Sequence, residues 1–236
     1  MLSNVLAIRR SANHAPILRR RSIQKIMTLI SLLFTNPVLF AILAVLLLYS
    51  VIAHETAHGF MAHLFGDDTA KMQGRLTFNP VSHLDIVGTL MLFLVGFGWA
   101  KPVPVDYRNL RHARLGLLSV SMAGCAVNIL IAMSALFLLR FNAVNANPML
   151  STMLYVLFKI NVILGAFNLL PIPPLDGSRI VASLLPEKAQ RILSRIEPYG
   201  LLLLIFLLFT GLMNPLISFM QHLIYNIINI VFNLFR

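Results

Sequence analysis

The stretch that decides the fold is PVLFAILAVLLLYSVIAHETAHGFMAHL, residues 37–64. Residues 26–53 carry no charged side chain, and about 20 apolar residues are enough for a helix to cross a bilayer. Asn36 and Pro37 offer a natural helix start, because proline is tolerated in the first helical turn. We therefore expect a transmembrane helix over residues 37–64, and this helix carries histidines and a glutamate near its end.

The composition of the whole chain also indicates a lipid environment. Of its 236 residues, 58% are hydrophobic and 11% are charged, whereas soluble proteins have about 45–50% and about 25%. A soluble core of this size cannot bury that much apolar surface. Cys125 is the only cysteine, which excludes an intrachain disulfide and a thiolate zinc cluster.

Further apolar segments predict more membrane spans. Two are expected over residues 115–139 and 150–172, followed by a helical hairpin over residues 198–236. The apolar segment 86–98 is too short to cross and is flanked by basic residues, so we expect a re-entrant element near residues 84–105. The predicted fold class is an all-α multi-pass membrane protein with about 5–6 transmembrane helices.

The net charge of +11 is distributed unevenly. Lys and Arg cluster before residue 26, between residues 66 and 114, and between residues 178 and 197. Basic clusters between apolar spans are typical of the cytoplasmic loops of membrane proteins. No basic face interleaved with aromatic residues accompanies them, so we expect no nucleic-acid partner.

The motif His54-Glu55-Thr56-Ala57-His58 carries the chemistry of the first span. On a helix, His54 and His58 lie one turn apart on one face, where two imidazoles can bind one metal ion, and Glu55 can reach a metal-bound water. The alternative is a pair of helix-end histidines that extend to the interface beside a surface glutamate. The cost of ionisable groups inside a membrane span favours the functional interpretation.

A hydrolytic zinc site usually has three protein ligands, so one more is needed. Leu64 occupies the position where a zinc protease of the HExxHxxGxxH type would have its third histidine. A better candidate is Asp176, the one carboxylate in the proline-rich, apolar segment 168–177 (NLLPIPPLDG), where a metal would offset the cost of its charge. Alternatively, Asp176 begins the next loop or caps a helix.

Together, the motifs at residues 54–58 and 168–177 make the chain resemble the site-2 protease family of intramembrane zinc metalloproteases. The likeness covers about residues 37–185 and resembles the short members, without an inserted PDZ or CBS domain. Three further stretches match: residues 74–80 (GRLTFNP) with His83 and Asp85 beyond them, residues 97–105 (FGWAKPVPV), and Gly124 with Asn128.

The resemblance implies a role for each matching residue. His54, His58 and Asp176 would bind one Zn²⁺ per chain, and Glu55 would be the general base. Asn128 and Asn168 are candidates to hold the oxyanion or position the substrate, or else form hydrogen bonds between helices. A second pair, His83 and Asp85, would orient a ligand from the second coordination shell or anchor a loop.

The resemblance further implies three regions and an activity. Residues 1–35 would be a basic N-terminal segment, interfacial or forming a short extra span, or an organellar presequence. Residues 36–197 would be the intramembrane metalloprotease core, and residues 198–236 the C-terminal hairpin.

The expected enzyme is a zinc metalloendopeptidase that cuts membrane-anchored proteins in or near their transmembrane segments. Its partners are that protein substrate and the lipid bilayer. It would be integral to a bacterial plasma membrane, with the active site towards the cytoplasmic side. The alternatives are a metal transporter or metal-binding membrane protein without proteolysis, and an inactive scaffold. The sequence leaves the oligomeric state open.

Overall fold

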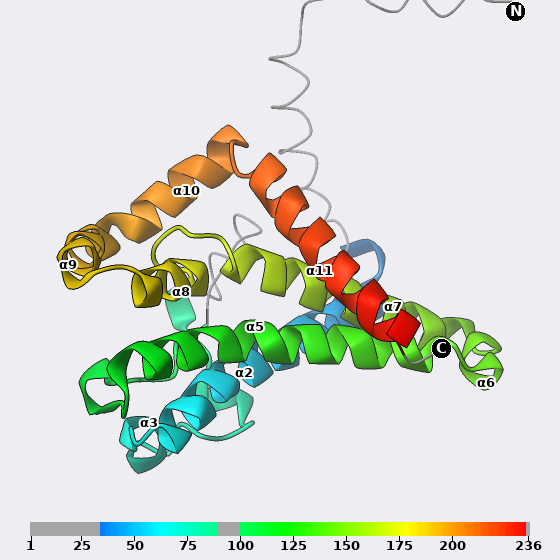
Figure 1. The fold of residues 1–236 in the computed structure, drawn as a ribbon. Coiled ribbons are helices and arrows are strands. Elements are labelled where there is room, and N and C mark those ends of the chain that lie inside the picture. The colour runs from blue at the N-terminus through cyan, green and yellow to red at the C-terminus, as the bar shows by residue number, and fades with distance from the viewer. Residues whose placement is uncertain (1–33, 89–99, 235–236) are drawn as a thin grey trace, which may run out of the picture. The chain divides into compact units, whose positions relative to one another are not determined.

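The computed structural model describes residues 34–88 and 100–234. Contacts divide the chain into two compact units, one of residues 1–41 and 85–99 and one of residues 42–84 and 100–236. All regular elements in the described residues are helices (Figure 1). The longer ones are α2 (Pro37–Leu64), α5 (Ala113–Leu138), α7 (Pro148–Asn168), α8 (Asp176–Leu184), α9 (Glu187–Ile196), α10 (Gly200–Thr210) and α11 (Asn214–Leu234). The shorter ones are α3 (Thr69–Met72), α6 (Asn142–Asn145), η1 (Pro80–Ser82), η2 (Tyr107–Asn109) and η3 (Glu197–Tyr199).

Five helical stretches among the described residues are long and apolar enough to cross a membrane, which confirms the predicted fold class. They are Pro37–Leu64, Ala113–Leu138, Pro148–Asn168, Glu187–Thr210 and Asn214–Leu234. The predicted re-entrant element falls mostly on residues 89–99, which lie outside the described residues, as do residues 1–33 of the N-terminal segment.

The third span ends earlier than expected. α7 stops at Asn168 instead of running on to residue 172, because Pro171 disfavours helical backbone at the residue before it. Two more prolines then keep the chain out of a helix until α8 begins at Asp176. The connection is therefore a short non-helical segment that ends on a carboxylate.

The core of the larger unit is built where α5, α7 and α11 pack together. Its buried members are mostly small or branched apolar side chains: Ala132, Ala135, Phe158, Val162, Ala166, Ile224 and Ile228. Small residues let helices approach closely in a membrane, where packing rather than the hydrophobic effect holds them together. A buried hydrogen bond from Asn161 Nδ2 to Ser50 Oγ (2.9 Å) joins α7 to α2.

Candidate metal centre

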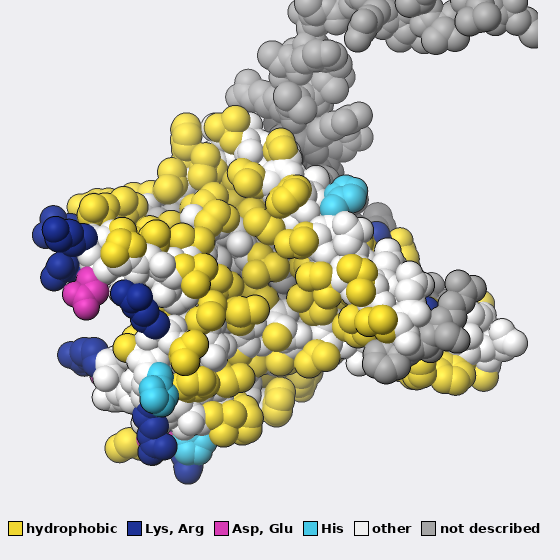
Figure 2. All heavy atoms as spheres, viewed as in Figure 1, with side chains coloured by type: hydrophobic (Ala, Val, Ile, Leu, Met, Phe, Trp, Pro, Cys, Tyr) yellow, Lys and Arg dark blue, Asp and Glu magenta, His cyan; other side chains and the backbone are white. Residues whose placement is uncertain are grey.

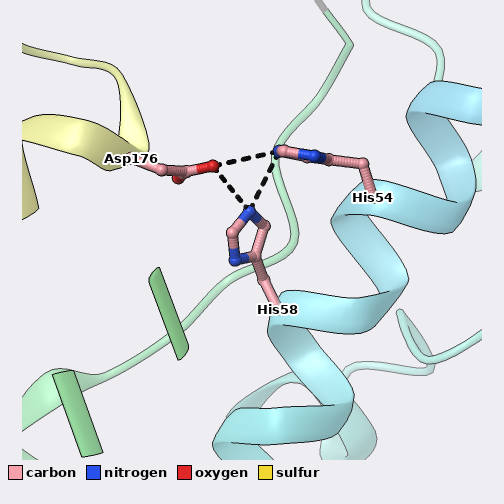
Figure 3. Close-up of side chains that lie close together, drawn as sticks. All are labelled: His54, His58 and Asp176. Atoms are coloured by element: carbon pink, nitrogen blue, oxygen red, sulfur yellow. Dashed lines mark hydrogen bonds and ion pairs between the residues drawn. The ribbon is translucent and has the colours of Figure 1, made fainter. Parts of the chain in front are cut away.

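The structure brings two histidines of α2 together with the first residue of α8 (Figure 3). The Nε2 atoms of His54 and His58 are 3.0 Å apart. Each Nε2 lies 3.1 Å from Oδ2 of Asp176. All three residues are buried, and among the described residues they form a group of histidine and acidic side chains that could hold a metal ion. Figure 3 shows the three side chains converging on one point from two helices that are far apart in the sequence.

The donor set and its spacing fit a metal ion. A tetrahedral zinc site with bonds of about 2.0–2.1 Å separates its ligand atoms by roughly 3.3 Å, a few tenths of an ångström more than the distances between these three atoms. Although Oδ2 of Asp176 is buried and close to both imidazoles, it accepts no hydrogen bond of good geometry from the described residues. A buried oxygen of this kind needs a cation as a partner.

The ionisation of Asp176 suits the same purpose. Burial favours the neutral acid and by itself would raise its pKa. When protonated, the imidazoles of His54 and His58 favour the carboxylate more strongly and place the pKa of Asp176 below its ordinary value. A metal ion bound by the neutral imidazoles would favour the carboxylate in the same way. Asp176 is therefore a carboxylate, the form that binds a metal ion.

The backbone of α5 orients the second histidine. Nδ1 of His58 lies 2.7 Å from the carbonyl oxygen of Val120, so it carries the proton and donates it. This leaves the lone pair of Nε2 directed at the candidate metal position. A histidine ligand in a metal site almost always donates its other ring N–H in this way.

Asn128 of α5 contacts the first histidine. Its Nδ2 lies 3.1 Å from Nδ1 of His54, and its Oδ1 is buried without a hydrogen-bond partner among the described residues. The nitrogen and oxygen of a side-chain amide are interchangeable by a half-turn of the amide group. After that turn, Oδ1 of Asn128 would accept the proton of His54 Nδ1 and leave Nε2 of His54 free to bind metal.

Gly124, one turn before Asn128 on α5, makes room for both imidazoles. A Cβ atom at this position would lie 2.4 Å from His58 Nε2 and 2.5 Å from His54 Cε1. Only glycine allows α5 to pass this close to the two rings. Gly177, next to Asp176, allows a close approach to the backbone of the preceding segment, because a Cβ there would lie 2.2 Å from the carbonyl oxygen of Leu169.

Glu55 projects from α2 beside the two histidines and is half-buried. Its Oε2 accepts a hydrogen bond from the backbone N–H of Val103 (3.0 Å). Val103 lies in the extended segment that leads into η2, and its side chain is buried. A backbone donor from a distant segment thus holds the predicted general base in place.

The remaining predicted site residues make other contacts. Asn168 donates from Nδ2 to the carbonyl oxygen of Leu164 in its own helix (3.1 Å). His83 is fully buried, with Nε2 2.8 Å from the carbonyl oxygen of Thr77. Asp85 accepts the backbone N–H of Gly88 (2.7 Å). The contacts of His83 and Asp85 are of the loop-anchoring kind, whereas that of Asn168 lies within one helix. The roles of the three residues in the reaction stay predictions.

The structure adds site residues that sequence reasoning did not single out. Gly124 was noticed only as part of a motif, and Val103 and Val120 act through backbone atoms that any residue would supply. Backbone donors and acceptors leave no signal in a single sequence. A glycine placed one turn before a polar residue in an apolar helix is a weak signal of close packing.

Comparisons with known proteins identify relatives. The family model described as Peptidase family M50 matches residues 141–211, which include Asp176 but not the histidine motif. The protein named "Putative zinc metalloprotease YwhC" from Bacillus subtilis is 43% identical over 177 residues, which are 72% of this chain and 81% of that protein. Another, "Putative zinc metalloprotease Rip2" from Mycolicibacterium smegmatis, is 31% identical over 71% of this chain and 66% of its own length.

A solved structure is also similar. The match is to "Site-2 Protease from Methanocaldococcus jannaschii", with 24% sequence identity and a TM-score of 0.45. It covers 86% of this chain and 83% of that one.

The fold and the candidate site indicate a class: a membrane-embedded protein with a His–His–Asp group on two helices that could bind a metal ion, and a glutamate beside it. The similarity to the Bacillus protein makes the assignment specific. The chain belongs to peptidase family M50, the site-2 protease family. The resemblance found in the sequence is thereby confirmed.

Proposed function

We propose that this protein is an intramembrane zinc metalloendopeptidase in which His54, His58 and Asp176 bind Zn²⁺ and Glu55 is the general base. The convergence of the three ligand atoms within 3.1 Å, deep among apolar helices, is the observation that carries the proposal. Family membership and the zinc metalloprotease names of the relatives support it.

The residues around the site have separate roles in the proposed peptide hydrolysis. Zn²⁺ at the three ligands would supply a Lewis acid and an acidified water. The carboxylate of Glu55 takes the proton from the attacking water and later delivers it to the amine that leaves. While Glu55 is ionised, the Val103 N–H holds its carboxylate in position. The Val120 carbonyl and the amide of Asn128 keep both imidazoles in the ligating orientation.

The proposed substrate is a membrane-anchored protein cut near the cytoplasmic face of the plasma membrane. Two observations support this side. Most of the Lys and Arg side chains visible in Figure 2 gather at one end of the molecule, at the left of the view. In addition, the segment 66–114, which connects the end of α2 to the start of α5, contains a cluster of basic residues: Lys71, Arg75, Lys101, Arg108, Arg111 and Arg114. A zinc site about two to three turns from the end of α2 would be reached from that side.

The competing function, metal transport, uses the same ligands without a base. Glu55 distinguishes the two, because it is next to the ligands without being one of the three that converge. The test is Glu55→Gln in the full-length protein, with cleavage of a single-span substrate and bound zinc measured together. A protease retains zinc and loses at least about a hundred-fold in cleavage rate, whereas a transporter continues to move metal.

A matched control removes a carboxylate elsewhere on the chain. Asp68→Asn is suitable, because Asp68 is exposed and contacts His63 at the end of α2. It should leave both zinc content and cleavage unchanged. Full cleavage by the Glu55→Gln variant would contradict the proposal, as would an absence of zinc from the wild-type protein.

A further inference from the structure

α9 is the most strongly amphipathic of the long helices among the described residues. Its ten residues are EKAQRILSRI, and none of them is buried. At about 100° per residue, the basic residues share one side, and the apolar residues share the side that adjoins it. The basic set is Lys188, Arg191 and Arg195, and the apolar set is Ala189, Ile192, Leu193 and Ile196. Ile192 is 60% exposed and Ile196 is 44% exposed, whereas Ala189 and Leu193 are half-buried. The part of the apolar side that adjoins the basic residues therefore faces outward.

α9 is oriented across the direction of a membrane-spanning helix. In Figure 1, α9 is seen nearly end-on, whereas α5 runs across the view, so α9 lies across the direction of that span. η3, which contains Pro198, separates α9 from α10. Figure 2 shows Lys and Arg side chains gathered at the same end of the molecule.

The exposed apolar surface of α9 continues into the membrane-spanning surface. Exposed large side chains follow one another at helical spacing through η3 and along α10: Ile192, Ile196, Tyr199, Leu202, Phe206 and Phe209. The stretch that can cross a membrane, Glu187–Thr210, contains α9, η3 and α10, and all of its charged side chains lie before α10. The apolar side of α9 therefore adjoins the lipid that surrounds α10. A helix with an apolar side in lipid and Lys and Arg beside it lies in the plane of the interface.

We propose that α9 is an interfacial helix whose Lys188, Arg191 and Arg195 bind the headgroups of anionic phospholipids. The helix carries three cations and one acidic residue, Glu187. The exposed Ile192 and Ile196 enter the acyl-chain boundary and hold the cations at headgroup level. Anionic lipid is the partner that combines negative charge with an adjoining apolar layer.

The proposed lipid-binding helix α9 is directly connected to α8, which carries one of the candidate metal ligands. Only Leu185 and Pro186 separate α9 from α8, and α8 begins with the ligand Asp176. Arg179 of α8 donates to Oε1 of Glu197 in η3 (2.9 Å), so the C-terminal end of α9 is also linked to α8. Anionic lipid that immobilises α9 therefore also immobilises α8, and, resting on the proposed function, it promotes cleavage.

The binding test uses the full-length protein in nanodiscs and needs no catalysis. Trp99, the single tryptophan, is replaced by Phe, and Ile192→Trp supplies a reporter on the apolar side of α9. Brominated phosphatidylglycerol or brominated phosphatidylcholine is incorporated at equal fractions. The anionic lipid should quench the reporter more strongly. Each cation near the surface strengthens the attraction about five-fold, so K188Q/R191Q/R195Q should abolish the difference.

A control triple variant, K71Q/R108Q/R114Q, removes the same charge from exposed positions outside α9. It should keep the preference for phosphatidylglycerol. Equal loss in both triple variants would overturn the proposal, because the preference would then be a net-charge effect. Equal quenching of the reporter by both lipids would also overturn the proposal. In that case an acidic protein segment would be the better partner for the basic side of α9. Absence of quenching by either lipid would remove α9 from the interface.

Cleavage assays in the same nanodiscs separate this inference from the proposed function. Faster cleavage with phosphatidylglycerol, lost in K188Q/R191Q/R195Q but not in the control, supports both. If the wild-type protein cleaves in neither lipid while the quenching preference persists, the proposed function fails and the lipid site stands.

Discussion

Gly124→Ala is the most direct test of how the metal centre is built. The added Cβ would lie 2.4 Å from His58 Nε2, 2.5 Å from His54 Cε1 and 2.6 Å from His54 Nδ1. Real Cβ contacts are essentially never shorter than 3.0 Å. Each ring must therefore move by about 0.4–0.6 Å (3.0 minus 2.6 or 2.4), whereas metal–ligand distances hold only to within about 0.2 Å.

The histidine rings can rotate away from the new methyl group, so the helices need not separate. The expected loss is therefore in metal binding rather than in folding. Misplacing a ligand by removing its hydrogen-bond partner costs about 10–100-fold in metal affinity, and direct displacement of two ligands should reach the upper figure. A hundred-fold loss corresponds to about 2.7 kcal/mol.

The assay is zinc competition against a chelator of known affinity, with helix content followed by circular dichroism. Gly165→Ala on α7 is the matched control. Its Cβ would come nearest to the flexible end of Ile224, at 3.3 Å, and would reach Asn128 Cβ and the Cys125 carbonyl oxygen only at ordinary van der Waals distances of 3.7 and 4.0 Å. It should keep wild-type zinc affinity. Wild-type affinity in Gly124→Ala would refute the reasoning, since it would mean that the two rings tolerate a methyl group between them and α5.

Three other substitutions test the surroundings of the site. Asn128→Leu should weaken zinc binding about 10–100-fold. Asn128→Asp can accept the His54 Nδ1 proton and should retain the wild-type zinc affinity. Equal zinc affinities of the Leu and Asp variants in the same competition assay would exclude a positioning role for Asn128. Burial by itself would raise the pKa of Asp67, but hydrogen bonds from Thr69, Asn109 and the Asp106 N–H lower it overall. The carboxylate of Asp67 therefore contributes stability above its ordinary pKa of about 4, and this contribution is lost as pH falls through the lower folded value. Asp67→Asn should lower the melting temperature at pH 7 and flatten its decline in acid, and a parallel decline would contradict this. Asn161→Leu removes the hydrogen bond from α7 to Ser50 of α2 and should lower the free energy of unfolding by about 0.6 kcal/mol. Ser50→Ala breaks the same bond, so denaturation in detergent should show a similar loss in both variants. No change in either variant would contradict this prediction.

The membrane spans could be read from the sequence because hydropathy is a local property. α2 has the bounds that its apolar run and Pro37 predict. The error at the end of α7 is local too: the apolar run continues to residue 172, but backbone sterics before Pro171 end the helix at Asn168. The chain composition and the helical spacing of His54 and His58 were sufficient to predict a multi-pass protein with a metal-binding helix face.

Only the tertiary structure decided how the site is completed. Asp176 had two interpretations in the sequence, ligand or helix cap, and the packing of α8 on α5 places its Oδ2 3.1 Å from both imidazoles. The supports of the site, Val120, Val103 and Gly124, act through backbone atoms or through the lack of a side chain. Such contributions depend on which segments meet in space, and neither hydropathy nor motif spacing contains that information.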